Sequence, residues 1–329
     1  MKRLAATLAV LAALAALSAV LPTLMNPYLF RILMLCGINV VLAVSLNLVN
    51  GFAGQFSIGH AGFMAVGGYT AAMLTLHVGQ GWAAALAAAG VPEEIARGVV
   101  LLAALLAGGG LAAIAGYLVG LPSLRLRGDY LAIVTLGFGE IIRVVLTNVD
   151  AVGASRGLPG IPGWTTFFWV SLAAVTVVVV SRNLAESTHG RALFAIRDDE
   201  IAAAAVGIDV AAYKVLAFTM GAFFAGVAGG LSAHYDSYLN PNSFTFIKSI
   251  EIVVMVVLGG MGSVSGAVLA AILLTLLPEA LRAVNEYRMV LYALMLIVLM
   301  IARPQGLFGN REVSLDVFRR LLPRRRAAS

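Results

Sequence analysis

The sequence predicts an all-α integral membrane protein with about ten transmembrane helices. Hydrophobic residues make up 61% of the 329 residues and charged residues 12%, whereas an average soluble domain is about 45–50% apolar and about 25% charged. Apolar stretches near the length of a bilayer crossing recur along the chain. No alternation of period two bounded by turns recurs, so a barrel is not indicated. Because only helices and closed barrels satisfy their backbones in lipid, helices remain.

This composition excludes a soluble globular enzyme, a disordered chain and a nucleic-acid-binding domain. The mean hydropathy is +0.96, and a soluble fold of this size could not hide so much apolar surface from water. The net charge is +6, but the basic residues sit between apolar stretches and near the end of the chain, which indicates topology. The single cysteine, Cys36, and four scattered histidines offer neither an internal disulfide nor metal-ligand spacing, so no metal site is predicted.

Ten apolar stretches define the predicted helices, each near the roughly 20 residues that a crossing needs. They are 4–22, 28–49, 57–76, 98–120, 130–149, 164–181, 211–233, 245–260, 264–282 and 287–302. The last is short, and the stretch 245–260 carries Lys248 and Glu251. Whether 57–76 and 245–260 cross fully or re-enter stays open. Residues 82–91 are too few to cross and predict a surface or re-entrant helix.

The first stretch allows two interpretations. A basic start, an apolar run and small residues near Ser18 are typical of a signal peptide. The same residues also make a retained first helix. We expect retention, because the remaining helices then take the orientation that their loop charges favour.

The basic residues set the predicted orientation. With the N-terminus in the cytoplasm and ten crossings, the inner segments hold 15 of the 22 lysines and arginines and the outer segments or outer helix ends hold six, while Arg143 lies mid-span. This bias follows the positive-inside rule. Both termini are therefore predicted to be cytoplasmic, in a single transmembrane domain over 1–310 followed by a basic cytoplasmic tail over 311–329.

The longest internal polar segment, 181–214, is then cytoplasmic. Three acidic residues beginning at Asp198 precede an apolar run, which predicts a helix starting there and ending at Gly207. A second short helix is expected over 191–196. The small side chains of Ala202–Ala205 form a flat surface that suits docking into a groove of another protein. The alternative is a solvated connector.

No motif indicates catalysis or ATP binding. A P-loop requires Gly directly before Lys, and the three lysines follow Met1, Tyr213 and Ile247. Neither a G-x-S-x-G nor an H-E-x-x-H pattern occurs. The chain is therefore predicted not to be an enzyme and to hold no cofactor, and any ATP and Mg²⁺ would bind to another subunit.

Small residues recur at a spacing of four in two of the predicted helices. This spacing places them on one helix face and lets neighbouring backbones approach closely. The two sets are Ala112, Gly116 and Gly120, and Ala222, Gly226 and Gly230. We interpret both as helix-packing surfaces.

Two segments share the spacing G-x-x-G-x-x-S at predicted cytoplasmic helix ends. They are Gly51–Ser57 and Gly259–Ser265. In one interpretation they are tight turns whose serines cap the following helices. In the other, glycine frees the backbone, and Gln55, Ser57 or exposed N–H groups line a gate or a broken helix.

Polar residues inside apolar stretches are candidates for a translocation path, because a charge at bilayer depth usually faces the bundle or a cavity. Glu140 and Arg143 are three apart and can pair, as can Lys248 and Glu251. Either pair could line a path or join helices. His60 is interpreted chiefly as a hydrogen-bonded packing group, with a path role as the alternative.

Five ordered segments carry a resemblance that spans residues 28 to 309. They are NLVNGFAGQFSIGHAGFMAVGGYTAAML (47–74), GDYLAIVTLGFGEIIRVVLTN (128–148), GRALFAIRDDEIAAAAVGIDVAAYKVLAF (190–218), VLGGMGSVSGAVLAA (257–271) and ARPQGLFG (302–309). Together they resemble the LivM-type permeases, which are inner-membrane subunits of bacterial ABC importers for branched-chain amino acids. Permeases for urea and short amides look similar, so the resemblance is weaker for substrate.

The resemblance implies a multi-pass protein of the bacterial inner membrane. Its implied partners are a second, LivH-like permease, two cytoplasmic ATP-binding subunits and a periplasmic substrate-binding protein. The segment 182–213 would couple the chain to the ATPase. The implied coupling residues are Gly190, Arg191, Arg197, Asp198, Asp199, Glu200, Ala202, Ala203 and Gly207.

The common importer loop has E-A-A followed by Gly, and Glu200-Ile201-Ala202-Ala203 with Gly207 only approximates it. The docking surface is thus better assigned than any one contact. Because the chain lacks its own ATP site, an ion-coupled secondary transporter using Glu140 or Glu251 is the competing hypothesis.

Overall fold

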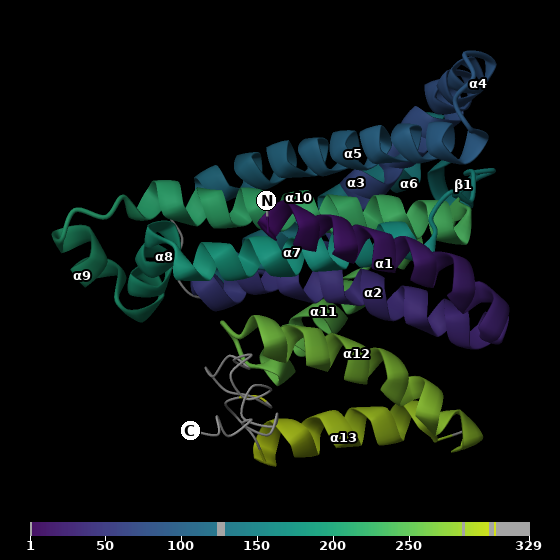
Figure 1. The fold of residues 1–329 in the computed structure, drawn as a ribbon. Helices are drawn as coiled ribbons and strands as arrows, with labels where there is room; N and C mark the ends of the chain where they lie inside the picture. Colours follow the sequence, from purple (N-terminus) through teal and green to yellow (C-terminus); the bar gives the residue numbers. More distant parts are fainter. Residues whose placement is uncertain (1, 124–128, 285–286, 303–305, 307–329) are drawn as a thin grey trace, which may run out of the picture.

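The computed structural model describes residues 2–123, 129–284, 287–302 and 306. Long helices lie side by side and run back and forth between two ends of the molecule (Figure 1). The short helices α8 and α9 lie at one end, and α4 and β1 lie at the other (Figure 1). The predicted basic tail over 311–329 falls outside the described residues.

A helix occupies each of the ten predicted apolar stretches. The long elements are α1 (Lys2–Leu24), α2 (Pro27–Asn47), α3 (His60–Leu74), α5 (Glu93–Ser123), α6 (Asp129–Asn148), α7 (Phe167–Glu186), α10 (Val210–Asp236), α11 (Phe246–Gly259), α12 (Val264–Ala280) and α13 (Arg288–Ala302). Among the described residues, seven helices are long and apolar enough to cross a membrane. These are Pro27–Phe52, His60–Ala88, Glu93–Leu121, Tyr130–Asn148, Phe167–Glu186, Val210–Asp236 and Pro241–Gly259.

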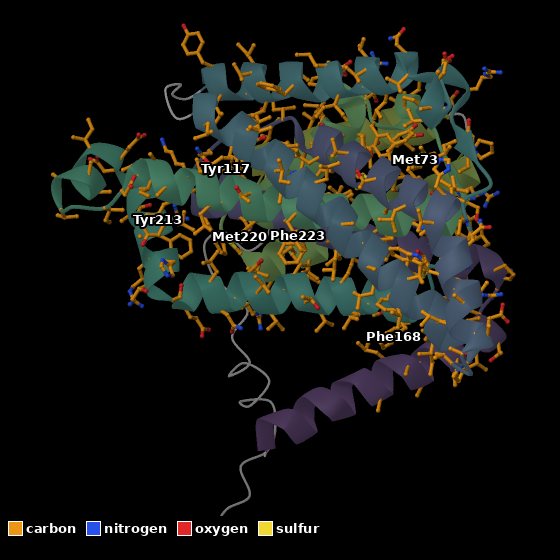
Figure 2. All side chains as sticks on the ribbon, turned by 90° about the horizontal axis from the view of Figure 1, so that it is seen from above. Met73, Tyr117, Phe168, Tyr213, Met220 and Phe223 are labelled. Atoms are coloured by element: carbon orange, nitrogen blue, oxygen red, sulfur yellow. The ribbon has the colours of Figure 1, made fainter. Side chains whose placement is uncertain are left out.

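The chain is therefore an all-α, multi-pass membrane protein. Ala12–Leu24 and Val264–Ala280 are shorter apolar helices in the part of the chain that the structure describes. The number of ten crossings and the cytoplasmic position of both termini stay predictions. α1 packs along α7 and α2, and its N-terminal half extends away from the other helices in Figure 2.

The segment expected as a separate short helix over 82–91 continues the preceding helix. A π-helical turn over Thr75–Gly79 joins α3 to α4 (Gln80–Ala88), so that His60–Ala88 forms one apolar helix. The buried Thr75 hydroxyl donates to the Ala72 and Ala71 carbonyls and is hydrogen-bonded to His234 Nε2 at 2.9 Å. A π turn displaces backbone carbonyls from the regular helical hydrogen-bond pattern. The Thr75 hydroxyl provides a hydrogen-bond partner for carbonyls at this turn.

The core forms where α10 packs against α5 and α3. The two predicted small-residue surfaces face each other there. A Cβ on Gly116 would lie 2.5 Å from Ala222 Cβ, and a Cβ on Gly226 would lie 2.5 Å from Ala112 Cβ. These distances are below van der Waals contact, so only glycine permits the approach. The packing interpretation of the two sets is confirmed.

At the end of the bundle opposite α9, two short strands join the loops that precede α7 and α11. β1 (Leu158–Pro159) pairs antiparallel with β2 (Tyr238–Leu239). The connections also contain the 3₁₀ turns Asp150–Val152, Ala154–Arg156 and Pro241–Ser243. Because backbone outside helices needs other partners, these segments lie at the helix ends, where such partners are available.

Candidate functional site

The predicted coupling segment folds as two short helices, α8 (Thr188–Asp198) and α9 (Glu200–Ala205). The Ser187 hydroxyl accepts from Gly190 N at 3.1 Å and begins α8. Asp199 Oδ1 accepts from Ile201 N and Ala202 N at 2.9 and 3.0 Å and begins α9. Gly207 ends the segment with φ +88°, a conformation that glycine adopts without strain. Both predicted helices and the predicted stop are confirmed.

A buried ion pair fixes α9 to the start of α10. Lys214 Nζ lies 2.8 Å from Glu200 Oε2, and the Lys214 side chain is only 9% exposed. Ala203 is buried at 3%, whereas Ile201 is 71% and Val206 is 77% exposed. The outer side of α9 is thus an apolar surface at the tip of the molecule. Of the predicted alanines, Ala202 faces outward and Ala203 packs inward.

The two G-x-x-G-x-x-S segments contact each other, and both lie against the end of α8. The π-helical turn Leu48–Phe52 at the end of α2 lies against the turn between α11 and α12. Gly262 N donates to Asn47 Oδ1 at 2.9 Å, and Asn47 Nδ2 donates to the Ser263 carbonyl at 3.2 Å. The buried Asn47, the last residue of α2, therefore joins the end of α2 to the Gly259–Ser265 segment by two hydrogen bonds.

Arg197, in the last turn of α8, contacts both glycine segments. Its Nη1 donates to the Gly51 carbonyl at 3.2 Å, and its Nε and Nη2 donate to Asp198 Oδ1 at 3.2 and 3.1 Å. The guanidinium lies 5.1 Å from the centre of the Phe194 ring, which itself lies 5.0 Å from the ring of Phe52. The sequence placed Arg197 in the coupling segment but gave no sign of these contacts.

The interpretation that serines of these turns cap the following helices is wrong for the first segment and confirmed for the second. Gly59 occupies the N-cap of α3 without a side-chain hydrogen bond, and Ser263, rather than Ser265, caps α12 by accepting from Gly266 N at 3.1 Å. Ser57 instead holds a loop: its N–H donates to Asn50 Oδ1 at 3.1 Å, and its carbonyl accepts from Asn50 Nδ2 at 3.4 Å. Ser57 thus lies in the loop before α3, and Gly59 rather than the serine occupies the N-cap.

Two candidate path residues in that loop are buried with unsatisfied atoms. Gln55 is 4% and Ser57 is 1% exposed, and within the described residues neither Gln55 Oε1 nor Ser57 Oγ has a hydrogen-bond partner. An unsatisfied buried polar atom costs about 1–3 kcal/mol. This loop, close to the glycine segments, therefore contains two buried oxygen atoms that lack a hydrogen-bond partner among the described residues.

His60, at the start of α3, is enclosed by the bundle with 1% exposure. Its Nε2 lies 2.8 Å from Ser45 Oγ, and the Ser45 hydroxyl donates its own proton to the Leu42 carbonyl at 2.9 Å. The Ser45–His60 hydrogen bond joins α2 to the start of α3 inside the bundle. This geometry supports the packing interpretation, and a path role for His60 stays a prediction.

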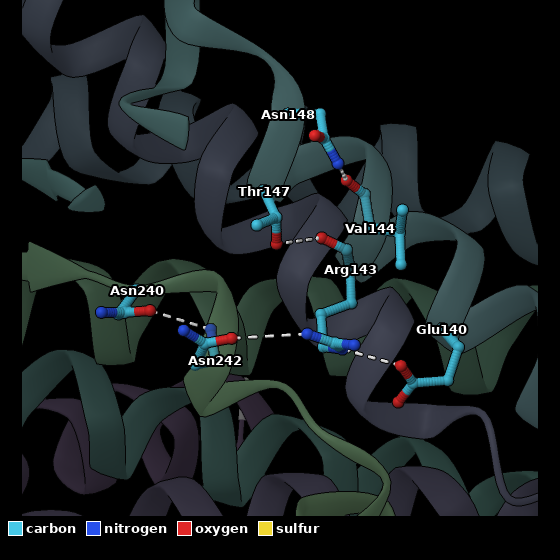
Figure 3. A network of polar contacts seen from close by, with 7 residues as sticks. All are labelled: Glu140, Arg143, Val144, Thr147, Asn148, Asn240 and Asn242. Carbon is cyan, nitrogen blue, oxygen red and sulfur yellow. Dashed lines mark hydrogen bonds and ion pairs between the residues drawn. The ribbon is translucent and has the colours of Figure 1, made fainter. Parts of the chain in front are cut away.

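Both predicted ion pairs form, on neighbouring helices. Glu140 Oε2 and Arg143 Nε on α6 are 2.7 Å apart, and Arg143 Nη1 donates to Asn242 Oδ1 at 3.3 Å (Figure 3). Lys248 Nζ and Glu251 Oε2 on α11 are 3.1 Å apart. Asn242 connects the pair on α6 to the chain leading into α11, and its side chain was not among the predicted polar groups.

The exposure of these pairs distinguishes them from the other path candidates. Side-chain exposure is 36% for Glu140, 25% for Arg143, 26% for Lys248 and 45% for Glu251. They lie on a surface of the chain formed by α6 and α11, whereas Gln55, Ser57 and His60 are enclosed. The predicted path candidates therefore divide into a buried group near the glycine segments and a partly exposed group of ion pairs.

Comparison with known proteins identifies the family. Residues 28–300 match a family described as branched-chain amino acid transport system / permease component. The chain is similar to the high-affinity branched-chain amino acid transport system permease protein LivM of Escherichia coli K12, with 38% identity covering 85% of this chain and 70% of the relative. It is also similar to a probable branched-chain amino acid transport permease protein LivM of Methanocaldococcus jannaschii, with 27% identity covering 86% and 93%.

A second kind of permease is also similar. The permease protein LivH of Escherichia coli K12 is 30% identical over 59% of this chain and 57% of its own length. No solved structure matches the chain. A family match over most of the chain, together with a helical membrane bundle whose polar segment folds as predicted, shows that the chain belongs to the branched-chain amino acid transport system permease family.

Proposed function

We propose that the chain is the membrane-spanning permease subunit of an ATP-binding-cassette importer that moves branched-chain amino acids into the cell. The observation that carries the proposal is the short helix α9, which presents Ile201 and Val206 at one tip of a bundle of apolar helices. Exposed apolar residues at such a tip favour a protein partner. In an importer, that partner is the ATP-binding subunit, with ATP and Mg²⁺ bound there.

The proposed topology has ten crossings in the bacterial inner membrane and α8–α9 in the cytoplasm. The charge bias supports this orientation, because the inner segments hold most of the basic residues. A periplasmic substrate-binding protein would deliver the amino acid to the opposite end, near β1 and α4. ATP binding would move the coupling segment and shift the bundle between outward-open and inward-open states. The size of the shift depends on how much more tightly ATP binds to one state than to the other.

The surface formed by α6 and α11 is the proposed contact with a second, LivH-like permease. Partly exposed ion pairs at bilayer depth are costly against lipid, and such residues usually face a bundle interior or a water-filled cavity. A second permease over Glu140–Arg143 and Lys248–Glu251 would remove them from lipid. A path between the two permeases would then pass charged groups of both signs, which suit a zwitterionic amino acid.

Substituting Ala202 with Glu is expected to reduce copurification of the ATP-binding subunits and ATP-driven uptake about tenfold, because a buried unpaired charge at a contact costs more than 1.4 kcal/mol. Ala85→Glu makes the same change on α4, an exposed helix at the opposite end, and should leave copurification of the ATP-binding subunits unchanged. Copurification with detergent-solubilised membranes measures the effect. Equal behaviour of the two variants would count against docking on α9.

Substituting Glu140 with Gln is expected to impair uptake more than assembly, because it removes a charge from the proposed path and keeps the shape of the side chain. The control is Glu93→Gln, which alters the exposed Glu93–Arg97 pair of α5. Uptake by proteoliposomes is compared with the amount of assembled complex. Proportionate loss of assembly and uptake would assign the Glu140–Arg143 pair a joining role instead.

Reconstitution tests the class of transporter. Purified chain alone, in liposomes with a proton or sodium gradient, should take up no L-leucine, whereas the complex with its partners should do so when ATP is supplied. Gradient-driven uptake without an ATPase would favour the secondary transporter. Competition of uptake by urea or acetamide, but not by valine, would point to the permeases for small amides.

A further inference from the structure

One side chain of the coupling segment touches both glycine segments at once. Arg197 belongs to α8, and Gly51 and Gly262 belong to turns that are more than 200 residues apart in the sequence. Arg197 Nη1 donates to the Gly51 carbonyl, and a Cβ on Gly262 would lie 2.8 Å from the same Nη1. The guanidinium therefore sits at the junction of the α2 end and the α11–α12 turn.

Two glycines that lie against Arg197, Gly54 and Gly262, leave room for its side chain. Gly54 has φ +65° and Gly262 has φ +93°, a backbone conformation that side chains disfavour. A Cβ on Gly54 would lie 2.8 Å from Arg197 Cγ and 3.1 Å from its Cα. Both the conformation and the space at these positions thus require glycine, and the space is filled by Arg197.

The chemistry of the junction suits arginine in particular. Leu48–Phe52 is a π-helical turn, which displaces carbonyls from regular pairing, and the Gly51 carbonyl accepts from Arg197. The planar guanidinium donates one hydrogen bond to this carbonyl and another to Asp198, and it lies over the ring of Phe194. A lysine ammonium carries no fork of donors and stacks less well. The contact is therefore directional, and movement of the end of α8 would displace the turn it holds.

We propose that Arg197 is the positioning residue that transmits displacement of α8 and α9 to the cytoplasmic ends of α2 and α11–α12 together. The proposal rests on the proposed function, in which a partner ATPase moves α9. Arg197 contacts both turns, and Asn47 at the end of α2 already joins them through Gly262 N and the Ser263 carbonyl. The ring contact of Phe194 with Phe52 adds a second link from α8 to the α2 end. The two turns then move as one unit when the coupling segment moves.

The first experiment measures the coupling of ATP hydrolysis to transport in the complete reconstituted complex. Arg197→Gln should lower L-leucine uptake per ATP hydrolysed about tenfold, because the charged hydrogen bond to the Gly51 carbonyl is lost. Assembly and basal ATP hydrolysis should persist. Arg197→Lys should recover part of the uptake. The matched control is Arg282→Gln, which makes the same change at an exposed arginine in the turn after α12.

The second experiment follows the two turns directly. The chain has one cysteine, Cys36, which is buried, so single reporters can be placed at exposed Phe56 and Met261. ATP binding to the assembled complex should change the rate at which a maleimide labels both reporters. Arg197→Gln should abolish both changes, and Arg282→Gln should abolish neither.

These outcomes separate the inference from the proposed function. If the ATP-binding subunits do not copurify with the unsubstituted chain, the proposed function fails. If they do and Arg197→Gln transports like Arg282→Gln, or its reporters still respond to ATP, only the inference fails. Loss of assembly in Arg197→Gln, in proportion to the loss of uptake, would likewise overturn it, because Arg197 would then be a structural residue.

Discussion

Replacement of Gly229 by alanine is expected to prevent the bundle from folding stably. A Cβ at this position would lie 1.9 Å from the Met64 carbonyl oxygen and 2.9 Å from Gly68 N. Both neighbours are backbone atoms of α3, so no side chain can rotate away and the helices must separate. Overpacking of a well-packed core costs about 1–3 kcal/mol, occasionally more. Here the separation would also open the α3–α10 contact along its length.

The measurement is the yield of monodisperse protein after detergent extraction, together with its thermal unfolding midpoint. Gly137→Ala is the control, because Gly137 lies on α6 with no atom within 4 Å of an added Cβ and alanine favours the helix by about 1 kcal/mol over glycine. The control should match or exceed the unsubstituted chain in stability. A Gly229→Ala protein as stable as the Gly137→Ala protein would show that α3 and α10 are not packed as described.

Removal of Glu200 is expected to release α9 from the bundle more severely than removal of both members of its ion pair. Glu200→Gln leaves the Lys214 ammonium buried and without its carboxylate partner, and unpaired buried charges are strongly unfavourable. The free energy that holds α9 on the bundle should fall by about 1.5–3 kcal/mol, which is the contribution of a hydrogen bond to a charged group. The segment between α7 and α10 should then be cleaved faster by a protease.

The double variant Glu200→Gln with Lys214→Met removes the uncompensated charge and fills a similar volume. Its protease sensitivity should lie close to that of the unsubstituted chain, because replacing a buried pair by apolar groups is often neutral. Limited proteolysis of the purified chain gives the comparison for the single and double variants. Equal sensitivity in both would mean that the ion pair does not hold α9.

The helices were predictable because the bilayer fixes their length and composition. Every predicted stretch became a helix, and the helix starting after Asp198 ended at Gly207, since acidic residues and glycine have local reasons to lie at helix ends. The continuity of α3 and α4 was not predictable. It depends on a π turn stabilised by Thr75 and His234, two residues more than 150 positions apart.

Local spacing also misled where two distant segments meet. The spacing suggested that serines of both turns cap the following helices. Ser263 does cap α12, but Ser57 caps no helix, because its loop is held by Asn50. The roles of Asn47 and Asn242 could not be predicted, because their hydrogen-bond partners lie on segments far away in the sequence. The ion pairs three residues apart were predictable because both members share a helix face.

The amino-acid sequence by itself determined the class of molecule, the extents of its helices, the packing faces of the two small-residue sets and the existence of a polar helical insertion. These properties depend on the solvent and on neighbours within a few residues. Only the tertiary structure decided that the two glycine segments touch, that Arg197 lies between them and that Ala203 faces inward while Ala202 faces outward. Such contacts join residues far apart in the chain, and their formation depends on the packing of whole helices.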